Sequence, residues 1–393
     1  MNYDTFTDVE TEIVRTVERF AEEKVRPKVA DLERAGTFPQ ALVSEMAELG
    51  LFGLAVPEEY GGLGLRLPVF AAVFERLSRA WTTIAAYANS HATVAYAITT
   101  HGSEAQKRRY LPSLATGAHR GALCLTEPGC GSDLQSIRGT LSATADGYRL
   151  NASKTYVTNG DRATLLLTLA RHPSRDGEAK ARFSLALVEK TLTGVEVTSA
   201  FHKMAFDLVD TMQIEMTDVP IPGDGLLGGS EGAGFRQLMD SLEVGRIAIA
   251  ISAVGLAANA LEEARRFASE RVTFGVTIDQ HQAIQLKLAD MATKLVAARL
   301  ISMEAAWQKE TGRRSDMIGA MAKLFASDMA VEIVQDAVRI HGGAGYIREY
   351  AVERLYREAL LYTIGEGTND INRLVIFRRM QGDDERQYLG LPS

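Results

Sequence analysis

Apolar residues recur at helical spacing over the first third of the chain. Ile13, Val17 and Phe20 follow Val9 on one face, because residues three and four positions apart lie on the same side of a helix. The same spacing predicts further helices over residues 40–49, 67–78, 82–100 and 103–117. We therefore expect an N-terminal helical domain over residues 1–120.

The hydrophobic period changes at Gly121. Alternation on both sides of Asp146 and Gly147 predicts a β-hairpin. Four more apolar runs separated by Gly and Pro are interpreted as strands, at residues 165–169, 183–188, 195–197 and 212–216. Short strands in this number predict a small β-sandwich or barrel, which we place at residues 121–232.

Helical spacing returns at Gly234 and continues in long segments, over residues 235–268, 280–307 and 317–340. Long helices with short breaks are typical of an antiparallel bundle, which we place at residues 233–393. The predicted fold is mainly α with a middle β domain.

Composition narrows the class of protein. The 393 residues are 46% hydrophobic and carry a net charge of −7, which argues against nucleic acid as a partner because phosphate binding needs a basic surface. Cys124 and Cys130 match no zinc pattern, and we expect two buried thiols. The N-terminus lacks the features of a signal peptide, and the longest apolar stretch, 247–261, is too short to span a bilayer. We expect a soluble, cytoplasmic protein.

Two stretches of the predicted β domain have residues suited to a flat ligand. The first, residues 123–133, reads LCLTEPGCGSD and has a turn of small residues after a strand; it could expose backbone N–H groups to a ligand or be a plain turn. The second, residues 154–160, reads KTYVTNG. Tyr156 and Thr158 would share one strand face, toward a ligand or toward solvent.

Two stretches of the helical segment could bind phosphate. Residues 271–275 read RVTFG, with Gln282 nearby, and pair a cation with an aromatic ring; a surface Arg at a helix end is the alternative. Residues 339–345 read RIHGGAG. Their glycines could approach a phosphate or simply end a helix, and His341 is interpreted as structural.

The fifth stretch, residues 365–372, reads GEGTNDIN and places Glu366 between two glycines, where Thr368 could cap a helix. A carboxylate without bulky neighbours could reach into a cavity. The alternative is a carboxylate that interacts only with the helix dipole.

The order and spacing of these motifs, together with HQAIQLKLADM from His281 onward, resemble the acyl-CoA dehydrogenase family over nearly the whole chain. The resemblance implies an N-terminal helical domain, a middle β domain and a C-terminal four-helix bundle. It also implies FAD as cofactor, and an assembly that is either a homotetramer (a dimer of dimers) or a dimer.

Carried over residue by residue, the resemblance implies an FAD site. One set would contact the flavin within the same subunit: Leu123, Leu125, Thr126, Ser132, Tyr156, Thr158, Thr368 and Asp370. Tyr156 stands where the family usually has Trp, and Asp370 is shorter than the usual Gln or Glu. A second set would hold the pyrophosphate and adenine side, the first three from a neighbouring subunit: Arg271, Phe274, Gln282, Arg339, Gly342 and Gly343.

The resemblance also implies the reaction. Glu366 would take the α-proton of an acyl-CoA thioester while a hydride passes from Cβ to flavin N5, giving the trans-2-enoyl thioester. Arg246, Gly367, Ser132 and Glu243, the last in place of the usual Asp, would contact the substrate. Some relatives carry the base one position before Arg246; Gly245 stands there and has no side chain, so Glu243 is the remaining rival carboxylate in that segment.

The substrate is less defined. Gly365 stands where many family members have Tyr, which would open space near the thioester, whereas Tyr87 and Tyr96 could shorten the pocket or point into the core. We expect a short or branched acyl group, in fatty-acid or amino-acid catabolism, with an electron-transfer flavoprotein as electron acceptor. A carrier-protein thioester as substrate, an oxidase that uses O₂ and a non-enzymatic helical scaffold are the alternatives.

Overall fold

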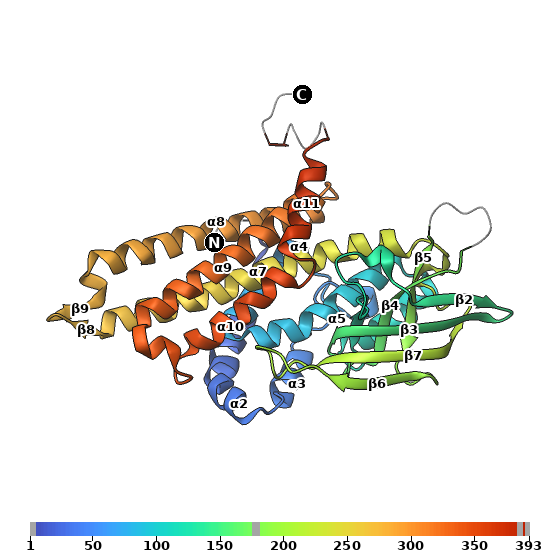
Figure 1. Cartoon of the computed structure of the whole chain (residues 1–393), viewed down its shortest axis with the longest axis horizontal. Coiled ribbons are helices and arrows are strands. Elements are labelled where there is room, and N and C mark those ends of the chain that lie inside the picture. The colour runs from blue at the N-terminus through green and yellow to red at the C-terminus, as the bar shows by residue number, and fades with distance from the viewer. Residues whose placement is uncertain (1–4, 175–180, 383–387, 390–393) are drawn as a thin grey trace.

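The computed structural model describes residues 5–174, 181–382 and 388–389. Helices from both ends of the chain pack together, and the sheet lies at one end of the long axis while a small hairpin, β8–β9, lies at the other (Figure 1). The predicted mainly α fold with a middle β domain is confirmed.

The N-terminal helices follow the hydrophobic pattern closely. They are α1 (Asp8–Arg19), α2 (Val29–Ala35), α3 (Gln40–Glu48), α4 (Leu67–Ala80), α5 (Thr82–His101) and α6 (Glu104–Ala115). A π-helical turn, Phe20–Val25, continues α1. The capping residues Thr7 and Ser103 fix two of the starts, since each side chain accepts a hydrogen bond from the third residue of its helix. Helices α4 and α5 are mostly buried and expose little surface to solvent.

Seven strands form one sheet in the order β1-β4-β2-β3-β7-β6, with β5 paired to β4. Their bounds are β1 (Gly121–Cys124), β2 (Thr140–Thr144), β3 (Gly147–Thr158), β4 (Leu165–Arg171), β5 (Phe183–Glu189), β6 (Val195–Ala200) and β7 (Thr211–Pro222). The predicted hairpin is β2–β3, in which Thr144 pairs with Gly147. A register shift between Lys154 and Val157 interrupts the β3–β7 ladder at Tyr156.

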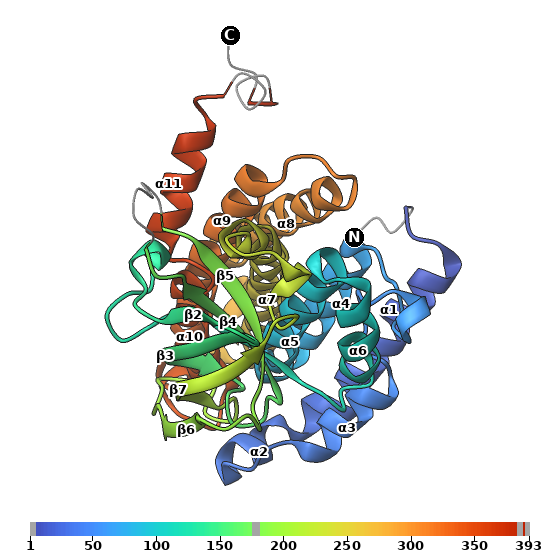
Figure 2. The ribbon, with the colours of Figure 1, turned by 90° about the vertical axis from the view of Figure 1, so that its right-hand side faces the viewer.

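The C-terminal helices are α7 (Gly234–Glu270), α8 (Gln282–Glu310), α9 (Asp316–His341), α10 (Ala351–Ile364) and α11 (Asn369–Arg379). Strands β8 (Val272–Thr273) and β9 (Val276–Thr277) form the hairpin between α7 and α8. Viewed along the long axis, α7 lies at the centre, between the N-terminal helices and the rest of the bundle (Figure 2).

Helix α7 also corrects one expectation. By length and composition it could cross a membrane, although we expected no stretch to qualify. Its most apolar window is 83% buried inside the molecule, which is typical of the core helix of a globular protein.

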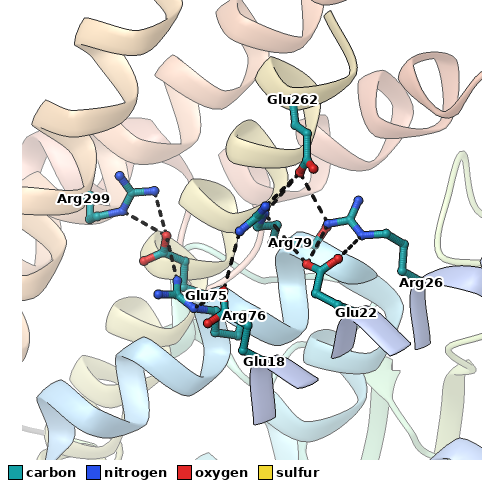
Figure 3. A network of polar contacts seen from close by, with 8 residues as sticks. All are labelled: Glu18, Glu22, Arg26, Glu75, Arg76, Arg79, Glu262 and Arg299. Carbon is teal, nitrogen blue, oxygen red and sulfur yellow. Dashed lines mark hydrogen bonds and ion pairs between the residues drawn. The ribbon is translucent and has the colours of Figure 1, made fainter. Parts of the chain in front are cut away.

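A network of charged side chains fastens the N-terminal helices to the bundle (Figure 3). At one end, Arg299 of α8 donates two hydrogen bonds, of 2.9 and 2.8 Å, to the buried carboxylate of Glu75 on α4. At the other, Arg79 and Arg26 both pair with Glu262 of α7. Because one cluster of buried apolar residues also runs through both helical regions, the two form a continuous core.

Candidate active site

Glu366 lies in the loop between α10 and α11. Its backbone is in the left-handed region, with φ of 54°, and the following Gly367 has φ of 85°. A non-glycine residue rarely adopts this conformation, and such strain concentrates at functional sites. Thr368 caps α11 as predicted, since its Oγ1 accepts a hydrogen bond of 3.3 Å from the Ile371 N–H.

The Glu366 side chain occupies the space that Gly245 leaves on α7. A Cβ at Gly245 would lie 2.9 Å from Glu366 Oε2 and 3.1 Å from its Cδ. Any side chain at position 245 would therefore have to displace the carboxylate. The space left by the missing side chain at Gly245 is therefore where the Glu366 carboxylate lies.

Burial and two cations act on this carboxylate in opposite directions. Burial raises the pKa of Glu366 above its usual range, while the nearby positive charges of Arg246 and Lys323 lower it, and burial prevails. Among the residues that the structure describes, none donates a hydrogen bond to the Glu366 carboxylate. The group is therefore unengaged and has an increased affinity for a proton.

Arg246 and Lys323 are both buried beside the loop. Arg246 is 8% exposed, and its Nε has no hydrogen-bond partner within the described chain. Burial also lowers the pKa of Arg246. Lys323, on α9, was not singled out from the sequence; the one signal was a lysine within an apolar helical segment.

Glu243, the rival carboxylate, is already engaged. Its Oε2 accepts hydrogen bonds from Lys309 Nζ at 2.9 Å and from Ser315 Oγ at 2.6 Å. Lys309 also donates to Asp240 Oδ1 at 2.6 Å, and Asp240 pairs with His101. Because Glu243 is already bonded to an ammonium group and a hydroxyl, the geometry favours the unengaged Glu366 as the base.

The turn after β1 is anchored by a buried ion pair. Lys154 is fully buried, and its Nζ donates to Glu127 Oε1 at 2.8 Å and to the Leu125 carbonyl at 3.1 Å. Glu127 Oε1 also accepts the N–H of Gly139 at 2.9 Å, and Oε2 accepts the N–H of Arg138 at 2.6 Å. Both charged residues fall inside motifs noted in the sequence, but their pairing was not predicted because it joins positions 27 residues apart.

The predicted flavin-contacting residues of the sheet lie around this anchored turn. Leu123, Leu125 and Thr126 are partly buried, whereas Ser132 is exposed. The ring of Tyr156 is 63% exposed and 5.0 Å from the ring of Phe201. Val157 is buried and Thr158 is partly buried. The expectation that Tyr156 and Thr158 share one face assumes a regular strand, and the register shift with a φ of 55° at Tyr156 interrupts that regularity.

The predicted pyrophosphate and adenine set lies at the other end of the molecule, where β8–β9 projects (Figure 1). Arg271 and Gln282 are exposed, and Phe274 at the hairpin tip is 98% exposed. The end of α9 is beside them, since His341 stacks on Phe267 of α7 at 4.3 Å. Arg339, Gly342 and Gly343 in that region are also exposed.

These residues fit the FAD that the resemblance implies. An exposed aromatic ring next to a hydroxyl on β3 suits a flat ring system, and Cβ atoms built at Gly342 and Gly343 would meet nothing within 4 Å, which leaves room for a phosphate. Asp370 is the least suited member, because it is exposed and pairs with Arg373 at 3.2 Å.

Five other residues can now be placed. Tyr87 is buried in the core, with its hydroxyl accepting a 2.6 Å hydrogen bond from Arg120, so it does not narrow a pocket. Tyr96 is partly buried, with Lys309 Nζ 5.9 Å from its ring centre. The buried His341 bonds the Ala337 carbonyl at 2.8 Å, a structural contact. Cys124 is buried, but Cys130 is only partly so.

Comparison with known proteins gives one consistent result. Family models described as the N-terminal, middle and C-terminal domains of acyl-CoA dehydrogenase match residues 7–118, 122–219 and 232–381. A probable acyl-CoA dehydrogenase, YngJ, of Bacillus subtilis is 39% identical over 374 residues, covering 94% of this chain and 98% of the relative. Benzylmalonyl-CoA dehydrogenase of Aromatoleum aromaticum is 37% identical, covering 97% and 100%. The solved butyryl-CoA dehydrogenase of Megasphaera elsdenii is 32% identical with a TM-score of 0.92, covering 96% and 99%.

Proposed function

Because the chain belongs to the acyl-CoA dehydrogenase family, we propose that it dehydrogenates an acyl-CoA thioester between Cα and Cβ with Glu366 as the base. The protein is an FAD-dependent oxidoreductase of that family. One observation carries the assignment of the base: the unengaged carboxylate of Glu366 is seated over Gly245 with burial raising its pKa.

The chemistry requires a placed base because the α-C–H of a thioester is a weak acid. A raised pKa increases the proton affinity of Glu366 and brings it closer to the working pH. The Glu366 backbone N–H has no acceptor in the described part of the chain, so it is available to the thioester oxygen as negative charge develops there. FAD, when bound, supplies the acceptor for the β-hydride.

The substrate would be held from α7 and the Glu366 loop. Arg246, Glu243, Gly367 and Ser132 are the proposed contacts to the thioester and its pantetheine arm. Arg246 Nε, buried without a partner in the described chain, supports this assignment because an orphan donor in that position has the capacity to bind a ligand oxygen.

A short or branched acyl group fits the space beside the base. A Cβ at Gly365 would contact only the Leu361 carbonyl, at 3.5 Å, so no protein side chain fills the position where many relatives have Tyr. The burial of Tyr87 in the core removes one of the two rings that could have shortened the pocket.

The flavin site would be completed by a second copy of the chain. The ring-binding set on the sheet and the hairpin set with Arg271, Phe274 and Gln282 lie at opposite ends of one molecule (Figure 1). Exposed apolar side chains on the bundle, among them Leu300 at 67%, Phe377 at 63% and Ile364 at 62%, support assembly through these helices. We infer a homotetramer in the cytoplasm, with an electron-transfer flavoprotein as acceptor and the chain divided into domains at 1–120, 121–232 and 233–393.

Anaerobic mixing with a panel of acyl-CoA esters tests the proposal. The wild-type holoenzyme should lose its oxidised flavin absorbance with short or branched esters. E366Q should bind FAD but reduce it about 10²–10⁴-fold more slowly, the usual contribution of a general base. Bleaching of E366Q at the wild-type rate would refute the assignment. The matched variant E243Q should raise the apparent substrate Kd with a smaller effect on the limiting rate.

A further inference from the structure

Lys323 is a fully buried lysine whose direct partners are neutral. Its Nζ donates to the Gly367 carbonyl at 2.8 Å and to Asn369 Oδ1 at 2.7 Å. Lysines are almost never fully buried unless they are paired, yet no carboxylate of the described chain lies within ion-pair distance of this one. The ammonium group is therefore held in the interior without a direct counter-ion.

Both acceptors of Lys323 belong to the segment that follows Glu366. The Gly367 carbonyl is part of the left-handed turn that aims the carboxylate at Gly245. Asn369, the first residue of α11, is also held against α9: its side-chain amide donates to Ser327 Oγ at 2.9 Å and to Asp328 Oδ1 at 2.6 Å. Lys323 thus fixes the backbone of the loop from one side, while α10 fixes it from the other.

The charge of Lys323 also acts on the carboxylate. Three charged groups face it: Glu366 from the loop, Arg246 from α7 and Asp328 from α9. Burial lowers the pKa of Lys323 to about 8, so the group remains mostly protonated at neutral pH. A cation fixed close to a buried carboxylate lowers its proton affinity.

From this geometry we propose that Lys323 is a positioning residue for the base: it holds the Glu366–Gly367 turn against α9 and places a fixed positive charge beside the Glu366 carboxylate. The proposal rests on the function proposed above, in which Glu366 removes the α-proton. The carboxylate would otherwise remain protonated, and so inactive, over more of the neutral range.

The test is the pH profile of anaerobic flavin reduction in the holoenzymes of K323M, K323Q and K323R. The two neutral variants should lower the limiting rate about tenfold or more at acidic pH, and should move the ionisation of the base up by about one pH unit, because an opposite charge close to a carboxyl typically shifts its pKa by one or more units. Their rates should rise with pH, but the rate of K323M, which has no donor for the Gly367 carbonyl, should stay below the wild-type rate. K323R retains charge and donors and should keep the wild-type ionisation.

S327A is the matched neutral control. Ser327 bonds the same asparagine, so its loss loosens the loop without removing charge, and it should reduce thermal stability while leaving the ionisation of the base in place. If K323M and K323Q keep the wild-type ionisation, or yield no folded holoenzyme, Lys323 is only structural and the proposal is overturned. A failure of the base assignment would appear separately, as fast flavin reduction by E366Q.

Discussion

The surroundings of Glu366 and the β8–β9 hairpin place charged residues in opposite settings. Around Glu366, the charged groups of Arg246 and Lys323 are buried and Glu366 itself is partly buried, between α7, α9 and the α10–α11 loop. On the hairpin, Arg271 and Phe274 stand exposed at one end of the long axis. Exposed aromatic and arginine side chains are characteristic of binding surfaces.

The difference indicates which half of the site one chain can build alone. Glu366 and its charged neighbours are already assembled by contacts within the chain, so folding alone fixes their geometry. The hairpin lacks any covering element among the described residues, and in the proposed assembly a second copy would complete it. We therefore expect substitutions around Glu366 to change the rate of flavin reduction, and substitutions on the hairpin to change FAD binding.

The largest effect should come from placing a side chain at Gly245, in the space that the Glu366 carboxylate occupies. In G245A the new Cβ would approach Glu366 Oε2 to 2.9 Å, and the carboxylate would have to move. A displacement of about 1 Å from the reacting atoms can cost about 10²-fold in rate, so stopped-flow flavin reduction should slow by that order while FAD content stays normal.

G319A provides the matched control for that variant. Gly319 lies on α9, and a Cβ there would meet nothing within 4 Å, so its rate should stay within about twofold of wild type and its stability should rise slightly, as for other helical Gly→Ala changes. A G245A enzyme as fast as G319A would show that the carboxylate does not depend on that space.

Much of the fold could be predicted because periodicity survives in the finished structure. The α7 segment was expected over 235–268 and is found at Gly234–Glu270, and the strand expected over 165–169 is found at Leu165–Arg171. Element ends shifted by a few residues, since caps and frayed turns depend on local hydrogen bonds that a hydrophobic pattern does not encode.

Local features of the site were predictable where the residues fall in one motif. Glu366 and Thr368 lie within a single stretch, and the cap that Thr368 provides for α11 is found as predicted. The role of Glu366 as base follows from the family resemblance and stays a prediction. Lys323 bonds the loop across 44 and 46 positions, and Glu127 meets Lys154 across 27. Such pairings come from how helices and strands pack, so one sequence read along its length does not reveal them.

The second prediction tests whether the hairpin serves another chain's site. R271A alone should weaken FAD binding about 10- to 100-fold, the order expected from losing a charge-assisted hydrogen bond. When E366Q and R271A chains are co-expressed and purified as mixed oligomers, sites that combine an intact Glu366 from one chain with an intact Arg271 from the other should recover measurable acyl-CoA-dependent flavin reduction.

Mixed oligomers of E366Q and G245A are the control for this complementation. Both substitutions affect the same half of the site, so every site retains one of the two defects and activity should not return. Recovery in that control, or its absence with R271A, would mean that the hairpin does not complete the site of a neighbouring chain.

The smallest expected effect concerns the pH dependence of stability, through the buried Glu358. Glu358 on α10 is fully buried, with Arg354 Nε 3.5 Å from its Oε1, and burial raises the pKa of Glu358 from 4.5 to about 7. The folded protein therefore holds this proton more tightly than the unfolded chain does. The resulting stabilisation is present in acid and is lost as pH rises from 4.5 through about 7.

E358Q should remove that dependence. The wild-type holoenzyme should lose up to about 3 kcal/mol of unfolding free energy from this group between acidic and mildly alkaline pH, since each unit of pKa difference corresponds to about 1.4 kcal/mol. Thermal unfolding at both pH values should show a smaller pH-induced fall in Tm for E358Q than for wild type. E12Q, which alters a surface carboxylate paired with Arg19, should retain the full fall. An unchanged fall in E358Q would show that another group causes the pH sensitivity.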